Sequence, residues 1–280
     1  MDTKITFDLL NKGIPAPKVV RKHVNENLNI AEPFGKLPLV IQVVSKRGSG
    51  KSFALGKLLT ENNLIGRKRF ENIYYFNPNH WSDPSWNKVK LRTRRIFTGE
   101  YDEDDKPIYK HIPIDYQFNK MDYDIVNEIL QEQTDTLAEV SDEDKLPQIL
   151  VVVDDIVLPP RDMENEDNPI SRIVRNGRHY GITLIYSIQR MKQLVSTVLR
   201  DNTDILMFWV NSNSNMLESI HDYYFKENLP NEVYHRLITK LRVPKTHNFI
   251  LLNMKDCFDL YVHMDKIGFG KVHLSKGLKK

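Results

Sequence analysis

The stretch LPLVIQVVSKRGSGKSFALGKLL, residues 37–59, decides the fold of this chain. Its first part, 37–45, is a dense run of apolar and β-branched residues, which is typical of a buried strand. A turn rich in glycine and serine follows, and residues 53–60 have the composition of a helix. A strand, a glycine-rich turn and a helix in this order form the frame in which a backbone binds a chain of phosphates.

The turn at 45–52 has the residues that a phosphate-binding loop (P-loop) needs. Its glycines let backbone N–H groups turn toward phosphate oxygens, where a side chain would block the approach. The lysine is predicted to reach the β- and γ-phosphates of a nucleotide, and the serine after it to bind Mg²⁺. The usual pattern G-x-x-x-x-G-K-[ST] has a glycine where this chain has Ser45, which ends the strand and is expected to be tolerated. The predicted nucleotide contacts are Gly48, Ser49, Gly50, Lys51 and Ser52.

A pair of carboxylates follows the most apolar segment. QILVVV, residues 148–153, reads as a buried strand and runs directly into Asp154 and Asp155. Asp154 is predicted to complete the oxygen shell of Mg²⁺. Asp155 is predicted to orient the attacking water or accept its proton, although it is one methylene shorter than the more usual glutamate. The alternative, a turn with two solvated aspartates, is disfavoured by the P-loop upstream.

Polar and basic side chains near the later strands are further catalytic candidates. Gln189 follows the apolar strand at 182–187 and is predicted to lie beside the Asp154 strand end, where it can position water. A ring ATPase also needs a cation from the adjacent subunit to stabilise charge on the γ-phosphate. Arg175, Arg178 and Arg200 are candidates, with the last two preferred, although a single arginine is more often a surface residue.

The rest of the chain predicts an α/β fold with a mostly parallel sheet covered on both faces. The predicted segments are an N-terminal arm at 1–36, a core at 37–212 and a C-terminal extension at 213–280. Further predicted elements are a strand at 73–76, a hairpin inserted at 92–115, helices at 122–138, 169–175 and 192–199, a strand at 204–210, a helical segment at 214–241, a hairpin of 248–253 with 258–264, and a mobile basic tail at 271–280.

Composition limits the class of protein. The 280 residues carry a net charge of +3, and 28% of them are charged with both signs interspersed, which excludes a disordered polyelectrolyte. The single cysteine excludes an internal disulfide framework and is typical of a reducing compartment. No apolar run approaches the roughly 20 residues that a membrane span needs. We therefore expect no membrane partner.

The order of these motifs carries a resemblance. The P-loop, the paired aspartates, GRHYGITLIYSIQ (177–189) and VLRDNTDILMF (198–208) resemble the genome-packaging ATPases of poxviruses, giant viruses and virophages, in the FtsK–HerA superfamily. The resemblance covers 38–210 and implies a RecA-like core, a pentameric or hexameric ring, ATP and Mg²⁺ as cofactors, and translocation of double-stranded DNA. It also implies viral capsid proteins as partners, and the host-cell cytoplasm or the virion as location.

Two other functions share the P-loop and stay open at this point. One is a small-molecule phosphotransferase, which normally adds an arginine-bearing lid; the other is a nucleotide-gated capsid assembly factor that does not move DNA. The sequence Asn119-Lys-Met-Asp122 matches a guanine-reading motif, but it follows a polar segment and precedes the aspartate pair, so we prefer ATP. Candidate DNA contacts, or simply solvated charges, are Lys88, Lys90, Arg92, Arg94, Arg95 and the tail lysines 271, 276, 279 and 280.

Overall fold

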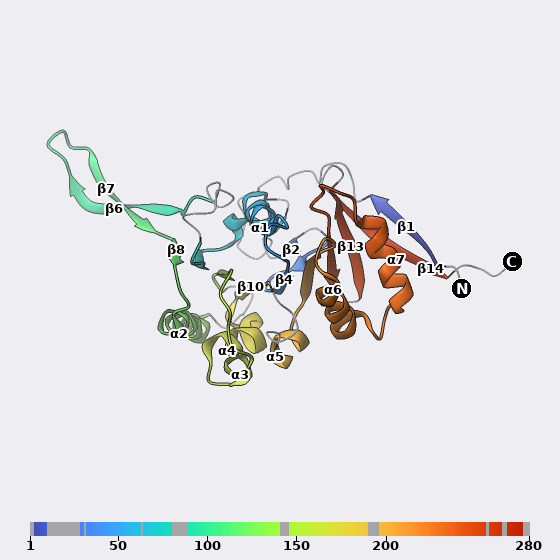
Figure 1. Cartoon of the computed structure of the whole chain (residues 1–280). Helices are drawn as coiled ribbons and strands as arrows, with labels where there is room; N and C mark the ends of the chain where they lie inside the picture. Colours follow the sequence, from blue (N-terminus) through green and yellow to red (C-terminus); the bar gives the residue numbers. More distant parts are fainter. Residues whose placement is uncertain are drawn as a thin grey trace.

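The computed structural model describes residues 3–9, 29–30, 32–62, 64–79, 89–140, 146–189, 196–255, 258–264 and 268–276. A ten-stranded sheet is the frame of the molecule (Figure 1), with the strand order β1-β14-β13-β12-β11-β4-β10-β9-β5-β8. In chain order these strands are β1 (Thr3–Leu9), β4 (Val40–Val44), β5 (Asn72–Phe76), β8 (Asp115–Phe118), β9 (Ile149–Val153), β10 (Ile182–Ile188), β11 (Ile205–Trp209), β12 (Phe249–Asn253), β13 (Asp259–Met264) and β14 (Gly268–Lys276).

The strands β11, β4, β10, β9, β5 and β8 are parallel to one another. They therefore end at one edge of the sheet, here called the carboxyl edge, and begin at the opposite, amino edge. Strand β10 lies between β4, which leads into the P-loop, and β9, which ends at Asp154. This arrangement brings the P-loop, the aspartate pair and Gln189 to the carboxyl edge. The predicted α/β class with a mostly parallel sheet is confirmed.

The other half of the sheet is antiparallel and unites both ends of the chain. The predicted hairpin is present as β12 and β13, and β14 pairs with β13 on one side and β1 on the other. The prediction of a mobile tail from residue 271 is therefore wrong as far as residue 276, where β14 ends. Phe7 lies opposite Val272, so the N-terminal arm supplies the outermost strand. The division into an arm, a core and an extension stays a prediction.

Helices cover both faces of the sheet and enclose two apolar cores. Helices α2 (Tyr123–Glu139), α4 (Pro169–Asn176), α5 (Thr197–Asp201), α6 (Ser214–Ile220) and α7 (Asn231–Leu241) contribute to one core. Helix α1 (Lys51–Thr60) packs on the opposite face with 34–39 and 64–70. Val151 and Val153 face the first core and Val152 the second, as a strand buried on both faces requires.

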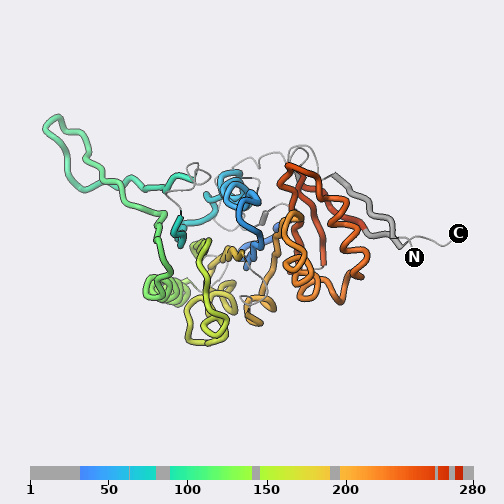
Figure 2. The backbone as a smooth tube through the Cα atoms, in the orientation of Figure 1, coloured from blue at the N-terminus to red at the C-terminus, as the bar shows by residue number. Residues whose placement is uncertain are grey.

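The predicted inserted hairpin is present and projects far from the body of the molecule (Figures 1 and 2). Strands β6 (Thr93–Tyr101) and β7 (Pro107–Pro113) pair antiparallel, with a register shift between Phe97 and Tyr101. The acidic turn 102–105 lies at its tip, and three aromatic side chains are exposed on it: Phe97, Tyr101 and Tyr109. A shorter pair, β2 (Asn29–Ile30) and β3 (Gly35–Lys36), precedes β4.

Two predicted helices differ from the observed ones. The helix expected at 192–199 is the short α5, at Thr197–Asp201, and residues 192–195 lie outside the described ranges. The segment 214–241 is not one helix: α6 passes into a π-helical turn at His221–Phe225, and α7 starts only after Pro230. Proline has no N–H to continue a helix and instead starts one, which explains the break. A short helix α3 (Pro160–Glu164) was not predicted.

None of the helices in the described ranges is both long and apolar enough to cross a membrane.

Candidate functional site

The P-loop connects the carboxyl end of β4 to the first turn of α1. Gly48 and Gly50 have φ angles of +76° and +93°, a region that glycine adopts readily and other residues rarely do. Helix α1 begins at Lys51, and the N–H of Ala54 donates to the carbonyl of Gly50 at 3.0 Å. The first N–H groups of this ten-residue helix thus face the loop, which is the arrangement that binds phosphate oxygens.

Lys51 is the centre of the site. Its side chain is buried, and its ammonium group donates to Asp155 Oδ1 at 2.6 Å and to Ser187 Oγ at 2.8 Å. It also forms an ion pair with Asp154 Oδ1. Ser187 belongs to β10, and both aspartates follow β9, so two neighbouring strands bring side chains to the lysine that begins α1.

The two aspartates lie in different surroundings, although they are adjacent in the chain. Asp154 is fully buried and accepts a hydrogen bond from Asn77 Nδ2 at 3.2 Å, and burial raises its pKa although Lys51 opposes that shift. Asp155 is half-buried, which by itself would raise its pKa. The hydrogen bond and positive charge of Lys51 outweigh that burial, so the pKa of Asp155 falls below its usual range. Asp155 is therefore the carboxylate that ionises more readily.

Gln189 reaches Asp155 directly. Its Nε2 donates to Asp155 Oδ1 at 2.5 Å, the same oxygen that Lys51 contacts. Asp155 also has a positive φ of 57°, which is uncommon for a residue with a side chain. Bonds to Lys51 and Gln189 hold it in this conformation, and such local strain is concentrated at functional sites. The structure brings the predicted catalytic pair together, and their roles in turnover stay predictions.

The donor set suits Mg²⁺ and not a metal cage. Among the described residues there is no cluster of three or more His, Cys, Asp or Glu side chains. Magnesium is instead usually held by one or two protein oxygens together with waters and nucleotide phosphates. Asp154 offers a carboxylate, and Ser52, in the first turn of α1, offers a hydroxyl. The residues present therefore fit the ion.

His247 is a site residue that the sequence reasoning missed. It lies between α7 and β12, about 200 positions from the P-loop in the chain, and its ring Nδ1 is 2.9 Å from the carbonyl oxygen of Ser49. A Cβ atom added at Gly50 would meet this ring at 3.0 Å. Gly50 is thus required both by its φ angle and by the close approach of His247. No motif signals this contact, because only the packing of the extension against the core creates it.

The predicted arginines do not reach the site of their own chain. Arg178 lies just before β10 and Arg200 just before β11, so both lie at the amino edge, opposite the P-loop. Arg175 and Arg178 line a cavity of about 230 Å³ there, together with the first residues of β4 and β10. Arg200 pairs with Asp201 at 2.8 Å. A role for either arginine at a P-loop therefore requires the P-loop of another subunit.

Part of the predicted basic segment has structural partners. Arg92 forms a bidentate ion pair with Asp115 and donates to the carbonyl of Phe70, and Arg94 pairs with Glu71. Arg95 stacks on Tyr109, with 3.6 Å between its guanidinium carbon and the ring centroid. Three of the candidate DNA contacts thus serve the base of the hairpin, which favours the interpretation as solvated or structural charges. Lys88, Lys279 and Lys280 lie outside the described residues.

The guanine-reading interpretation of residues 119–122 receives no support. Asp122 caps α2, accepting hydrogen bonds from the N–H groups of Asp124 and Ile125. This capping role explains why an aspartate stands there.

Structures with a similar fold include two of viral packaging proteins. One is that of B204, the DNA-packaging ATPase from Sulfolobus turreted icosahedral virus, with a TM-score of 0.50, 14% identity, and coverage of 80% of this chain and 96% of that chain. Another is that of the genome packaging NTPase B204 from Sulfolobus turreted icosahedral virus 2 in complex with AMPPCP. Its TM-score is 0.48 at 13% identity, and the match covers 80% of this chain and 96% of that chain. The pCW3 conjugation coupling protein TcpA with ATPγS has a TM-score of 0.41 at 11% identity, and the match covers 83% of this chain and 59% of that chain. At 14% identity, the likeness to the first of these proteins shows the fold alone.

Sequence comparison is more specific at the level of the family. No curated protein sequence matches the chain significantly. The family described as poxvirus A32 protein, in contrast, matches residues 30–226, which is more than half of the chain and includes the P-loop, both aspartates, Gln189 and the two arginines. The chain therefore belongs to the poxvirus A32 protein family.

Proposed function

We propose that this chain is a Mg²⁺-dependent ATPase that assembles into a ring and moves double-stranded DNA into a virus capsid. The observation that carries the ATPase part is that Lys51 and Gln189 both donate to the same carboxylate oxygen of Asp155, beside the P-loop. The family membership, and the names of the packaging proteins with a similar fold, support DNA packaging as the purpose of the hydrolysis.

The residues divide the chemistry as follows. Backbone N–H groups of the P-loop bind the phosphates, and Lys51 moves from the carboxylates to the β- and γ-phosphates when nucleotide enters. Asp154 and Ser52 would hold Mg²⁺, which supplies positive charge to the phosphates when it is bound. Once Lys51 has moved, Asp155 is free to accept the proton of a water that attacks the γ-phosphorus, while Gln189 orients that water. The bond from the γ-phosphorus to the β–γ bridging oxygen breaks in the same reaction, and ADP leaves with that oxygen.

The position of the arginines supports a ring. A cation that neutralises charge developing on the γ-phosphate is part of many phosphoryl-transfer sites. In this chain Arg178 and Arg200 lie at the amino edge, whereas the P-loop lies at the carboxyl edge. We propose that one of them acts on the P-loop of the neighbouring subunit, which makes hydrolysis depend on assembly.

The setting of this activity follows from the same proposal. Packaging requires contact with double-stranded DNA and with capsid proteins, and it occurs at the assembly site in the host-cell cytoplasm or in the virion. Of the predicted segments, the core 37–212 carries the residues of the proposed ATPase chemistry. The extension 213–280 reaches that site through His247, which contacts the P-loop. The arm 1–36 contributes no residue to the proposed chemistry.

ATP turnover with and without duplex DNA, on protein of known oligomeric state, tests the proposal. We expect Mg²⁺-dependent hydrolysis that duplex DNA stimulates and that Lys51→Ala abolishes. Turnover without any response to DNA would overturn the motor and leave the capsid assembly factor or the phosphotransferase. Absence of turnover in assembled wild-type protein would overturn the ATPase assignment itself.

A further inference from the structure

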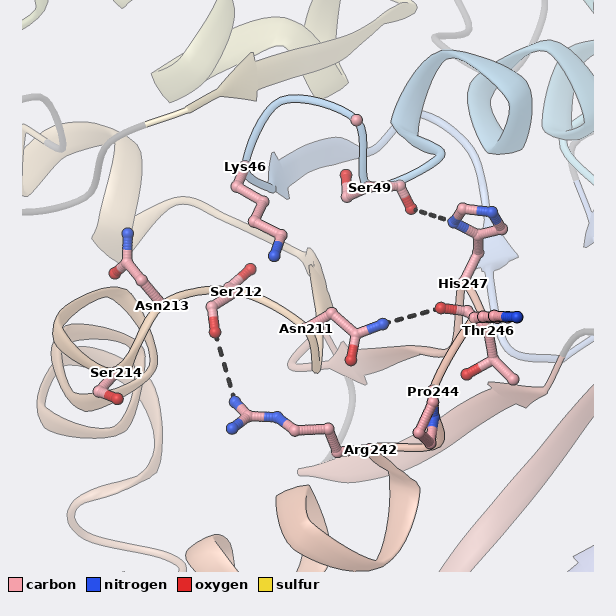
Figure 3. A pocket seen from close by; sticks show the side chains of 12 residues that line it. Lys46, Ser49, Asn211, Ser212, Asn213, Ser214, Arg242, Pro244, Thr246 and His247 are labelled. Atoms are coloured by element: carbon pink, nitrogen blue, oxygen red, sulfur yellow. Dashed lines mark hydrogen bonds between the residues drawn. The ribbon is translucent and has the colours of Figure 1, made fainter.

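A pocket of about 630 Å³ opens beside the P-loop (Figure 3). Three segments that are distant in the chain form its walls. The first is the P-loop itself, the second is the segment 211–214 that follows β11, and the third is the turn 242–247 between α7 and β12. The third belongs wholly to the predicted C-terminal extension, to which the sequence assigned no role, and the second spans the boundary between the core and that extension.

The direction of a bound nucleotide points to this pocket. Asp155 follows β9 and Gln189 follows β10, and both strands lie on the same side of β4 in the sheet. Because these two residues are proposed to act on the γ-phosphate, the γ-phosphate has to lie on that side. A triphosphate is a linear chain, and its nucleoside must therefore leave the P-loop in the opposite direction. In the sheet, β11 and β12 lie on that opposite side of β4, and the pocket lies at the carboxyl end of β11.

The side chains that line the pocket are suited to bind a ligand with phosphate and hydroxyl groups. Lys46, Arg242, Lys245 and His247 supply basic groups, and the described lining contains no acidic side chain. Ser49 and Ser212 are buried, and among the described residues their hydroxyl oxygens have no hydrogen-bond partner. Hydroxyl groups suit a ribose, and positive charge suits the α-phosphate.

The walls are also fixed to each other before any ligand arrives (Figure 3). His247 is bonded to the carbonyl of Ser49, and Asn211 Nδ2 donates to the carbonyl of Thr246 at 2.8 Å. Arg242 donates to the carbonyl of Ser212 at 3.3 Å and to that of Val210 at 3.1 Å. Because these bonds join the extension to the core, the pocket is preformed, which lowers the entropic cost of binding.

We propose that this pocket binds the nucleoside end of the nucleotide, chiefly its ribose and α-phosphate, so that the turn 242–247 of the C-terminal extension forms the second wall of the ATP site. The proposal rests on the proposed function, because it takes the P-loop to bind a nucleoside triphosphate. It assigns the extension a part in substrate binding, and it makes His247 a positioning residue for the P-loop.

A bulky substitution at the rim of the pocket separates the nucleoside end from the triphosphate. Ser214 lines the pocket and is exposed at the start of α6, so Ser214→Trp fills the space without disturbing the core. Its neighbour Asn215 is equally exposed and does not line the pocket, which makes Asn215→Trp the matched control. The two ligands are Mg²⁺·ATP and Mg²⁺·tripolyphosphate, which has the phosphate chain without a nucleoside, and calorimetry measures both affinities without any need for turnover.

We expect Ser214→Trp to weaken ATP binding at least about tenfold, the factor that about 1.4 kcal/mol of lost contacts gives. Tripolyphosphate should bind this variant as it binds wild type, and Asn215→Trp should bind both ligands normally. Unchanged ATP affinity in Ser214→Trp would overturn the nucleoside pocket while leaving the ATPase in place. Wild-type protein that binds neither ligand would overturn the proposed function, and the pocket assignment with it.

A charge variant gives a second, independent measurement. Lys245 has a φ of +60°, so Lys245→Gly removes its charge at a position where glycine is favoured, and the fold should tolerate the change. We expect ATP to bind about threefold more weakly, with a shallower dependence on salt. Lys226→Ala removes the same charge from the exposed turn after the π-helical segment and is the control. Equal ATP affinities in the two variants would contradict a contact between Lys245 and the nucleotide.

Discussion

The two edges of the parallel half of the sheet carry opposite kinds of chemistry. At the carboxyl edge, a lysine, two carboxylates and an amide form one hydrogen-bonded cluster around Lys51. At the amino edge, Arg178 is exposed, and its one hydrogen bond within the described residues goes to the adjacent His179. Arg200 pairs with the aspartate next to it. The first edge carries the residues that we propose to bind Mg·ATP and activate water, and the second carries the two arginines that we propose as trans cations. Under the proposed function, one subunit would therefore contain two incomplete halves of a catalytic site, which assembly brings together.

The largest expected effect is at the carboxyl edge. Lys51→Ala should abolish ATP turnover, because no other side chain of the cluster can place a positive charge on the β- and γ-phosphates. Lys57→Ala, an exposed lysine on the same helix, should turn over normally in the same assay.

Lys51 also has a structural role that this experiment has to separate from catalysis. Removing it leaves Asp154 buried without its cation, so Lys51→Ala should lower the free energy of unfolding, by up to about 3 kcal/mol. The double variant Lys51→Ala/Asp154→Asn should recover stability in thermal melts and remain inactive. Recovery of turnover in the double variant would show that the loss came from folding and would contradict the P-loop assignment.

The second effect joins the two edges across a subunit boundary. A cation acting in trans contributes on the order of 10³ or more in rate, so Arg200→Ala should lose about that factor if Arg200 is the trans cation. Mixing Arg200→Ala, which has an intact P-loop, with Lys51→Ala, which has an intact arginine, should restore part of the turnover. Arg178→Ala belongs in the same mixture as the competing candidate.

Concentration dependence is the control for this mixing experiment. Turnover per subunit should rise steeply with protein concentration as rings form. Flat turnover per subunit, together with no recovery in either mixture, would mean that the site is complete within one chain and that the arginines at the amino edge have only local roles.

The contrast between the edges also shows how far the sequence could be interpreted. The motif residues of the carboxyl edge could be placed from the sequence, because each of them follows an apolar strand directly: the P-loop after β4, Asp154 after β9 and Gln189 after β10. Parallel strands joined by helices end at the same edge, so local patterns were enough to place these residues together. The inserted hairpin was predictable for a similar reason, since an acidic, proline-containing turn lies between two β-type runs.

Features that depend on pairing between distant segments were not predictable. The basic tail is polar and short, and only its partners β13 and β1 make it a strand. His247 has no motif around it, and its contact with Ser49 exists only because the extension packs against the P-loop. The break in the segment 214–241 was within reach of the sequence, because Leu229-Pro230 marks it, and the apolar pattern on both sides concealed it.

The third effect lies within the aspartate pair. Asp155→Asn should keep Mg·ATP binding and lose about 10² or more in turnover, because the amide cannot accept a proton from water. Asp154→Ala should instead weaken Mg·ATP binding, measured by calorimetry in the presence and absence of Mg²⁺. Wild-type turnover in Asp155→Asn would place the catalytic base elsewhere.

The smallest effect is a difference in the pH dependence of stability between the two aspartates. The pKa of Asp155 is lowered, mainly because Lys51 outweighs the effect of burial, so its ionised form stabilises the fold. That contribution is complete above the unfolded pKa, near 4, and is lost as the pH falls through the lower folded pKa. For Asp154 the sign is reversed: burial raises its pKa, so stability decreases as the pH rises from the unfolded to the folded pKa.

In thermal melts without nucleotide, Asp155→Asn should therefore be destabilised at neutral pH, by about 1 kcal/mol or less for a half-buried pair, and approach wild type in acid. Asp154→Asn should differ from wild type in the opposite direction at neutral pH. If both variants shift the melting temperature in the same direction at neutral pH, the two carboxylates share Lys51 equally, and the division of their roles into metal ligand and base loses its physical basis.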